Sequence, residues 1–168
     1  AFTAGFGGVA HMDTSFTSDT AFDLTYASLA KTLRITSSVA QVSATVAGTS
    51  SFIPISGSIV MNPGTPSDFD FTFTAPVGEG VTSFALTFLE RNNYAVGGAS
   101  FTVSATFSDG TTASATSVVG DIDPAVVAKG TDDTFWSFTA PAGHSITKIS
   151  IDGTSGSPPL IDDIAFIT

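Results

Sequence analysis

Alternation of apolar and polar residues with a period of two most constrains what this chain can fold into. It is cleanest at 101–107, where Phe, Val and Ala alternate with Thr and Ser, and it recurs at 40–46 and 69–73. Successive side chains of a strand point to opposite faces, so each segment predicts a strand with one buried face. The pattern therefore favours an all-β chain.

Turn signals connect the predicted strands. Asp109–Gly110 lies between two alternating runs and predicts a tight hairpin with a type I′ turn, which needs positive φ at both central residues. The segment 81–90 is apolar on both faces, as in a central strand. The segment 52–61 contains Pro54 and Gly57, which predicts an edge or bulged strand.

One internal repeat relates two parts of the chain. Residues 73–82 and 138–147 both read Phe-Thr-Ala-Pro, one residue, then Gly, and both end on an apolar residue and Thr. Each copy predicts a strand, a Pro–Gly turn and another strand, placed on opposite halves of a sandwich. We expect a single domain over 1–168, an antiparallel β-sandwich that is jelly-roll-like, with negligible helix.

Charge and composition exclude several classes of function. The formal net charge is -10 and the chain has only 5 Lys and Arg, so binding to nucleic acid or to an anionic membrane surface is not expected. There is no cysteine and no apolar run long enough to cross a membrane. With many Ser and Thr, this composition predicts an exported protein, extracellular or on the cell surface, and Ala1 is typical of a residue left by signal cleavage.

The second half of the chain resembles a known class of domain. Phe138-Thr-Ala-Pro with its Gly turn, the short run Ile149-Ser-Ile-Asp and the terminal Ile161-Asp-Asp-Ile-Ala-Phe resemble exported β-sandwich domains of bacterial surface proteins of the PEP-CTERM kind. The resemblance covers roughly 68–166 and lacks the sorting tail. The end motif is also similar to that of jelly-roll carbohydrate-binding modules.

Asp162 and Asp163 are the candidate metal ligands. Strict alternation would align Asp162 with Ile164 and Phe166, and a buried acid must be paired, hydrogen-bonded or bound to a cation. The resemblance to binding modules implies a structural calcium on Asp162, with Asp163 as second choice and Asp13 or Asp19 completing the site. The alternative is that Asp162 accepts backbone N–H bonds while Asp163 faces water.

Trp136, Tyr94 and Tyr26 are the candidate sugar platforms, because exposed aromatic rings stack on sugars. The alternative for Trp136 is a place in the core. Catalysis is not expected, since His11 and His144 have no metal-binding spacing and no Gly-x-Ser-x-Gly motif occurs.

The N-terminal segment predicts an assembly role. Phe2, Ala4, Phe6 and Ala10 alternate along a glycine-rich stretch that has little stability as an isolated strand. Such a strand can complete the sheet of a neighbouring subunit, or pair within its own sandwich. The leading hypothesis is a non-catalytic surface protein that self-associates into an extracellular filament or matrix; the alternative is a calcium-stabilised carbohydrate-binding module that takes a polysaccharide.

Overall fold

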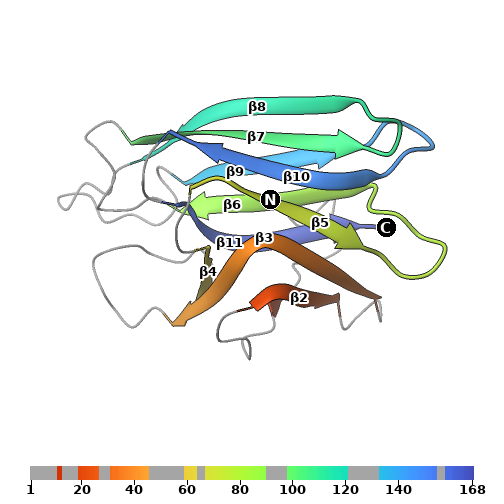
Figure 1. The fold of residues 1–168 in the computed structure, drawn as a ribbon, viewed down its shortest axis with the longest axis horizontal. Coiled ribbons are helices and arrows are strands. Elements are labelled where there is room, and N and C mark those ends of the chain that lie inside the picture. Colours follow the sequence, from red (N-terminus) through yellow and green to blue (C-terminus); the bar gives the residue numbers. More distant parts are fainter. Residues whose placement is uncertain are drawn as a thin grey trace.

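The chain folds into two antiparallel sheets packed face to face, which confirms the predicted β-sandwich (Figure 1). The computed structural model describes residues 11–12, 19–26, 31–45, 59–63, 67–89, 98–120, 133–154 and 158–168, and these contain strands and turns but no helix. The strands are β1 (His11–Met12), β2 (Asp19–Tyr26), β3 (Lys31–Thr45), β4 (Ile59–Asn62), β5 (Phe69–Thr74), β6 (Ser83–Leu89), β7 (Ala99–Phe107), β8 (Thr112–Val119), β9 (Thr134–Thr139), β10 (Ile146–Gly153) and β11 (Leu160–Ile167).

The two sheets share one strand. Sheet A, as defined here, runs from β1 and β2 through the first half of β3 to β5, β10, β7 and β8. Sheet B runs from the second half of β3 through β4, β11 and β6 to β9. The strand β3 bends between its two halves (Figure 1). The strand predicted at 40–46 is thus the second half of a longer strand, which begins at Lys31 and extends to Thr45.

The core lies between the sheets and is rich in phenylalanine. The alternating run predicted at 101–107 buries every odd residue of β7, which confirms its orientation. Aromatic rings from both sheets meet there: Phe88 of β6 contacts Phe101 of β7 edge-to-face at 5.3 Å, and it also packs on Trp136 of β9 at 5.6 Å. The Phe88–Phe101 contact joins the two sheets, whereas the Phe88–Trp136 contact lies within sheet B.

The strand β6 is buried along its whole length, as its apolar character on both faces predicted. Phe84, Leu86 and Phe88 point into the core between the sheets. Ser83, Ala85, Thr87 and Leu89 point the other way and are also buried. The outward side of sheet B is therefore covered along this strand.

The internal repeat forms two equivalent crossings between the sheets. Glu79 N donates to Pro76 O at 2.9 Å in the first copy, and His144 N donates to Pro141 O at 3.0 Å in the second. Gly78 and Gly143 have positive φ, as the third residue of such a turn requires. The first turn leads from sheet A to sheet B and the second leads back, which confirms the predicted strand–turn–strand device. Its predicted placement on opposite halves of the sandwich is wrong, because the two copies lie side by side.

The two copies also meet each other. Val81 and Ile146, which occupy the same position in the repeat, form an isolated antiparallel bridge. Because equivalent residues pair antiparallel, a local two-fold relation passes between them. The crossings thereby hold one another at one end of the sandwich.

The hairpin predicted at Asp109–Gly110 is present, but the type I′ turn is wrong. Among the described non-glycine residues only Asp163 has positive φ, so Asp109 does not, whereas Gly110 has φ 84°. Gly110 N donates to Phe107 O and Phe107 N donates to Thr111 O. The loop thus has three residues, 108–110, with Gly110 in the left-handed conformation. A three-residue loop combines a type I turn with a third residue at positive φ, which fits the twist of the two strands.

Two further expectations need correction. Strict alternation along β11 is wrong, because Asp162 pairs with Thr87 and Ala165 pairs with Ala85, so two residues bulge opposite Leu86. The edge position predicted for 52–61 is wrong for its described part, since β4 lies between β3 and β11. Pro54 and Gly57, where the alternative of a bulge would lie, fall outside the described residues.

Candidate functional site

The C-terminal acids lie at the β-bulge of β11. Asp163 has φ 49°, a left-handed conformation that Asp adopts more readily than most residues. The bulge turns Asp162 to the outward side of sheet B beside Thr87, away from the core face of Ile164. Asp162 is 3% exposed and its Oδ1 accepts a hydrogen bond from Asp163 N at 2.9 Å. This contact is the backbone bond that the alternative to calcium predicted.

The described residues contain no group of three or more acidic or histidine side chains placed to hold a metal ion. Asp13 lies outside the described residues, and Asp19 is placed in β2 by its backbone alone. The calcium prediction therefore rests on the sequence resemblance.

Trp136 lies in the core at 4% exposure and packs on Phe88. Its position is the core alternative stated above, and its ring presents no open face for a sugar. Its indole Nε1 has no hydrogen-bond partner. Tyr94 and the side chain of Tyr26 are outside the described residues, so the predicted sugar platform gains no support here.

Ser108, Asp109 and His144 meet where two turns touch. His144 Nδ1 is 3.4 Å from Ser108 Oγ, and its Nε2 is 3.8 Å from the Asp109 carboxylate. The hydrogen bonds of Asp109 go to its own turn, from Thr111 N at 2.9 Å and Thr111 Oγ1 at 2.7 Å. The Thr111 hydroxyl bond, followed by the Thr111 backbone bond, lowers the pKa of Asp109.

This trio differs from a nucleophile, base and acid arrangement. Ser108 Oγ accepts from Ser145 N at 3.1 Å, and Ser108 N donates to Ser145 O at 2.8 Å. A catalytic triad needs the serine and the acid within hydrogen-bond reach of opposite nitrogens of one buried imidazole. Here the contacts join the β7–β8 hairpin to the β9–β10 turn, which is a structural connection.

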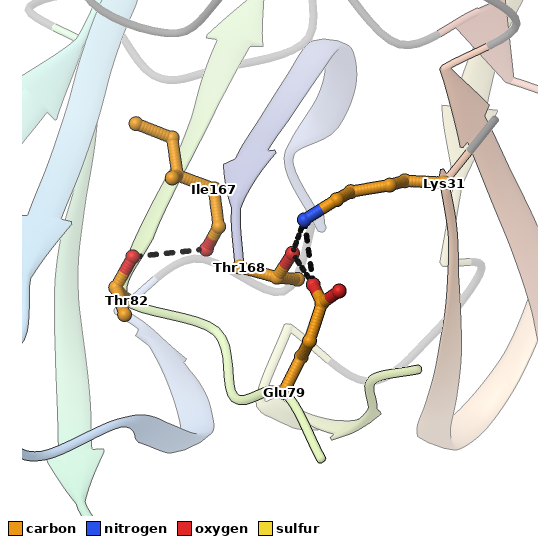
Figure 2. Close-up of polar contacts among 5 residues, drawn as sticks. All are labelled: Lys31, Glu79, Thr82, Ile167 and Thr168. Atoms are coloured by element: carbon orange, nitrogen blue, oxygen red, sulfur yellow. Dashed lines mark hydrogen bonds and ion pairs between the residues drawn. The ribbon is translucent and has the colours of Figure 1, made fainter. Parts of the chain in front are cut away.

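A second polar cluster holds the end of β11, as Figure 2 shows. Lys31 Nζ donates to Glu79 Oε2 at 2.6 Å and to Thr168 Oγ1 at 2.8 Å, and the Thr168 hydroxyl donates to the same Glu79 oxygen. The hydrogen bond from Lys31, followed by that from Thr168, lowers the pKa of Glu79. Beside it, Thr82 N donates to Ile167 O at 2.7 Å. The cluster ties β3, the β5–β6 turn and the C-terminal residue together.

One feature that stands open to a partner is β8, the outer strand of sheet A at the top of Figure 1. Its side chains are exposed on both faces from Thr112 to Thr116, Ser117 is half-buried, and Val118 is 53% exposed. The strand carries no charged residue in a chain of net charge -10. Natural edge strands are usually protected by charges, prolines, bulges or covering segments, and β8 contains none of the first three.

The backbone of β8 offers hydrogen bonds along its free side. Phe107 N donates to Thr111 O, so the pair Phe107–Thr111 is hydrogen-bonded. In an antiparallel pair, hydrogen-bonded and non-hydrogen-bonded residue pairs alternate along the strands. The odd residues from 113 to 119 therefore form backbone hydrogen bonds with β7. The even residues, from Thr112 to Val118, turn their N–H and C=O groups outward. The Val118 carbonyl confirms this direction, since Thr134 Oγ1 donates to it at 3.1 Å. No other described strand pairs with this side.

The predicted assembly residues Phe2, Ala4, Phe6 and Ala10 lie outside the described residues. The edge strand β8 was predicted as a strand but not as a site. The sequence contains one signal for an edge strand. Residues 112–119 have small or hydroxyl side chains at every position but the last two, whereas the neighbouring strand 101–107 has large apolar side chains at alternate positions.

Comparison with protein-family models, with curated proteins and with solved structures found no match to this chain. Within the described part of the chain, no helix has the length and apolarity needed to cross a membrane.

Proposed function

We propose that this chain is a non-catalytic, exported surface protein that works by self-association, as a subunit of an extracellular filament or matrix. The observation that carries the proposal is the unprotected edge of sheet A. Its outer strand is uncharged, exposed on both faces and turns free backbone groups outward. Such an edge favours the addition of a further strand, whose ladder bonds give affinity.

The sequence also supplies a strand for donation to a neighbouring subunit. Residues 1–10 alternate apolar side chains and contain glycines that leave them little stability alone. Donation of this strand to the next subunit is a head-to-tail contact, and contacts of that kind propagate as filaments because they do not close. Export is supported by the absence of cysteine, the low charge density and the many Ser and Thr.

Deletion of residues 1–10 tests this function. The full chain is expected to form polymers visible by negative-stain electron microscopy as its concentration rises. The truncated chain is expected to keep its β-type circular dichroism spectrum and its melting transition but to lose the polymers. A full-length chain that is monomeric by sedimentation at every concentration would contradict the proposal.

A further inference from the structure

The free edge of β8 is complementary to itself. If two copies of β8 run antiparallel with Ala115 opposite Ala115, then Ser114 faces Thr116 and Thr112 faces Val118, with these even residues exchanging backbone bonds. Ala113 faces Ser117 on the other side. The outward N–H and C=O groups from Thr112 to Thr116 then each meet a partner group of the second copy, while the Val118 carbonyl is shared with Thr134 Oγ1.

The side chains of this pairing also fit. Neighbouring pairs of the same kind already exist between β7 and β8, where Ser104 lies opposite Ser114 and Thr102 Oγ1 bonds to Thr116 Oγ1 at 2.7 Å. Cross-strand pairs of hydroxyl and β-branched residues stabilise a sheet, whereas like charges directly opposite one another destabilise it. Two chains of net charge -10 repel, so an uncharged strand is the place where close approach costs least.

We propose that β8 is an interface between two copies of this chain, which join sheet A to sheet A across a two-fold axis at Ala115. This inference rests on the proposed function and assigns the open edge of sheet A. The edge takes a second copy of β8, so a donated strand of residues 1–10 would add elsewhere, as at β9, the outer strand of sheet B. A contact in which both copies use the same surface is complete after two copies, so the β8 contact forms a dimer. A separate head-to-tail contact would then join these dimers into a longer assembly. An edge contact alone is smaller than the roughly 1,200 Å² of a stable interface. We therefore expect the pair to be weak in dilute solution and strong within the assembly.

Single-cysteine cross-linking reads this register directly, because the chain has no cysteine of its own. Ala115 would lie in a pair without backbone bonds, where Cα atoms are about 4.5 Å apart, a separation that a disulfide spans. Under mild oxidation at high protein concentration, Ala115→Cys is expected to form a covalent dimer. Ala113→Cys and Ser117→Cys are each expected to stay monomeric alone but to form a mixed dimer together, identified by a tag on one of them.

Two variants control the experiment. Ala142→Cys, in the exposed β9–β10 turn, measures random collision and is expected to give little dimer. Adding Ser114→Pro to Ala115→Cys removes an outward N–H but no bond to β7, so the cross-link should be lost while the melting temperature is nearly unchanged. Salt screens the repulsion between copies and should raise the cross-linking yield.

Three outcomes overturn the two-fold pairing. Equal dimer formation at 113, 115, 117 and 142 would mean collision only. Polymers without an Ala115→Cys dimer would leave the proposed function standing and remove this interface. A mixed dimer between Ala115→Cys and Ala4→Cys, in place of the symmetric one, would mean that residues 1–10 occupy β8.

Discussion

Asp163 holds a backbone conformation that few side chains tolerate. Its φ of 49° places it in the left-handed region at the bulge of β11. Aspartate and asparagine adopt this region more readily than other residues with a Cβ, and β-branched residues adopt it worst. The bulge is also what lets both Ile161 and Ile164 point into the core, three positions apart.

Replacing Asp163 should therefore separate backbone strain from side-chain chemistry. Asp163→Val is expected to lower the free energy of unfolding by about 1–2 kcal/mol. Asp163→Asn is the matched control and should change it much less, because it keeps the shape and the tolerance for positive φ. Urea unfolding followed by circular dichroism measures both. Equal losses in the two variants would mean that the carboxylate charge, and not the backbone, sets the cost.

Glu79 makes the stability depend on acid. The hydrogen bond from Lys31 is the largest cause that lowers the pKa of Glu79 in the folded state. Ionised Glu79 therefore stabilises the fold at pH values above the ordinary carboxyl pKa. This stabilisation is lost as the pH falls through the lowered pKa of the folded state. The melting temperature of the wild-type chain should thus fall as the pH drops below about 4.5. In Glu79→Gln that fall should be smaller. A Glu79→Gln curve parallel to wild type between pH 5 and 2 would show that Glu79 contributes nothing to it.

At the scale of elements, the contact between sheets depends on a few rings. Phe88 is fully buried and touches Phe101 of one sheet and Trp136 of its own. Phe88→Ala is expected to lower the free energy of unfolding by about 3–5 kcal/mol. Phe135→Ala is the control on the neighbouring strand, because Phe135 is 44% exposed, and it should cost far less. Chemical denaturation tests this, and similar losses in both variants would contradict the assignment of the core.

The strands themselves could be predicted from the sequence, whereas their irregularities could not. Alternation located β5 and β7 because each buries one face, and the uniform apolarity of β6 reflected burial on both. The bulge at Asp163 was missed because one inserted residue hardly changes the local composition. It nevertheless reverses which side of the sheet each preceding side chain of β11 faces. The hairpin turn was misassigned because Asp-Gly also occurs in a three-residue loop.

At the scale of the whole molecule, the candidate site depends on what lies beside each strand. The sequence of 112–119 predicts a strand, but only the strand order shows that it ends a sheet. Trp136 illustrates the same limit, since a ring on an alternating strand can face a ligand or the core, and the packing of Phe88 decides. Residues 1–10 were assigned a role from their pattern alone, and that role stays a prediction.

The bent strand β3 has a consequence for how the molecule responds to stress. Its first half is hydrogen-bonded within sheet A and its second half within sheet B, so the sandwich is sealed along one flank by a continuous backbone. Load applied to either sheet is carried into the other through covalent bonds, not only through the sliding contact of side chains. Along the opposite flank, between β8 and β9, none of the described strands runs through both sheets. A molecule that is reinforced along one flank and ends in an open strand along the other resists tension unequally on its two sides.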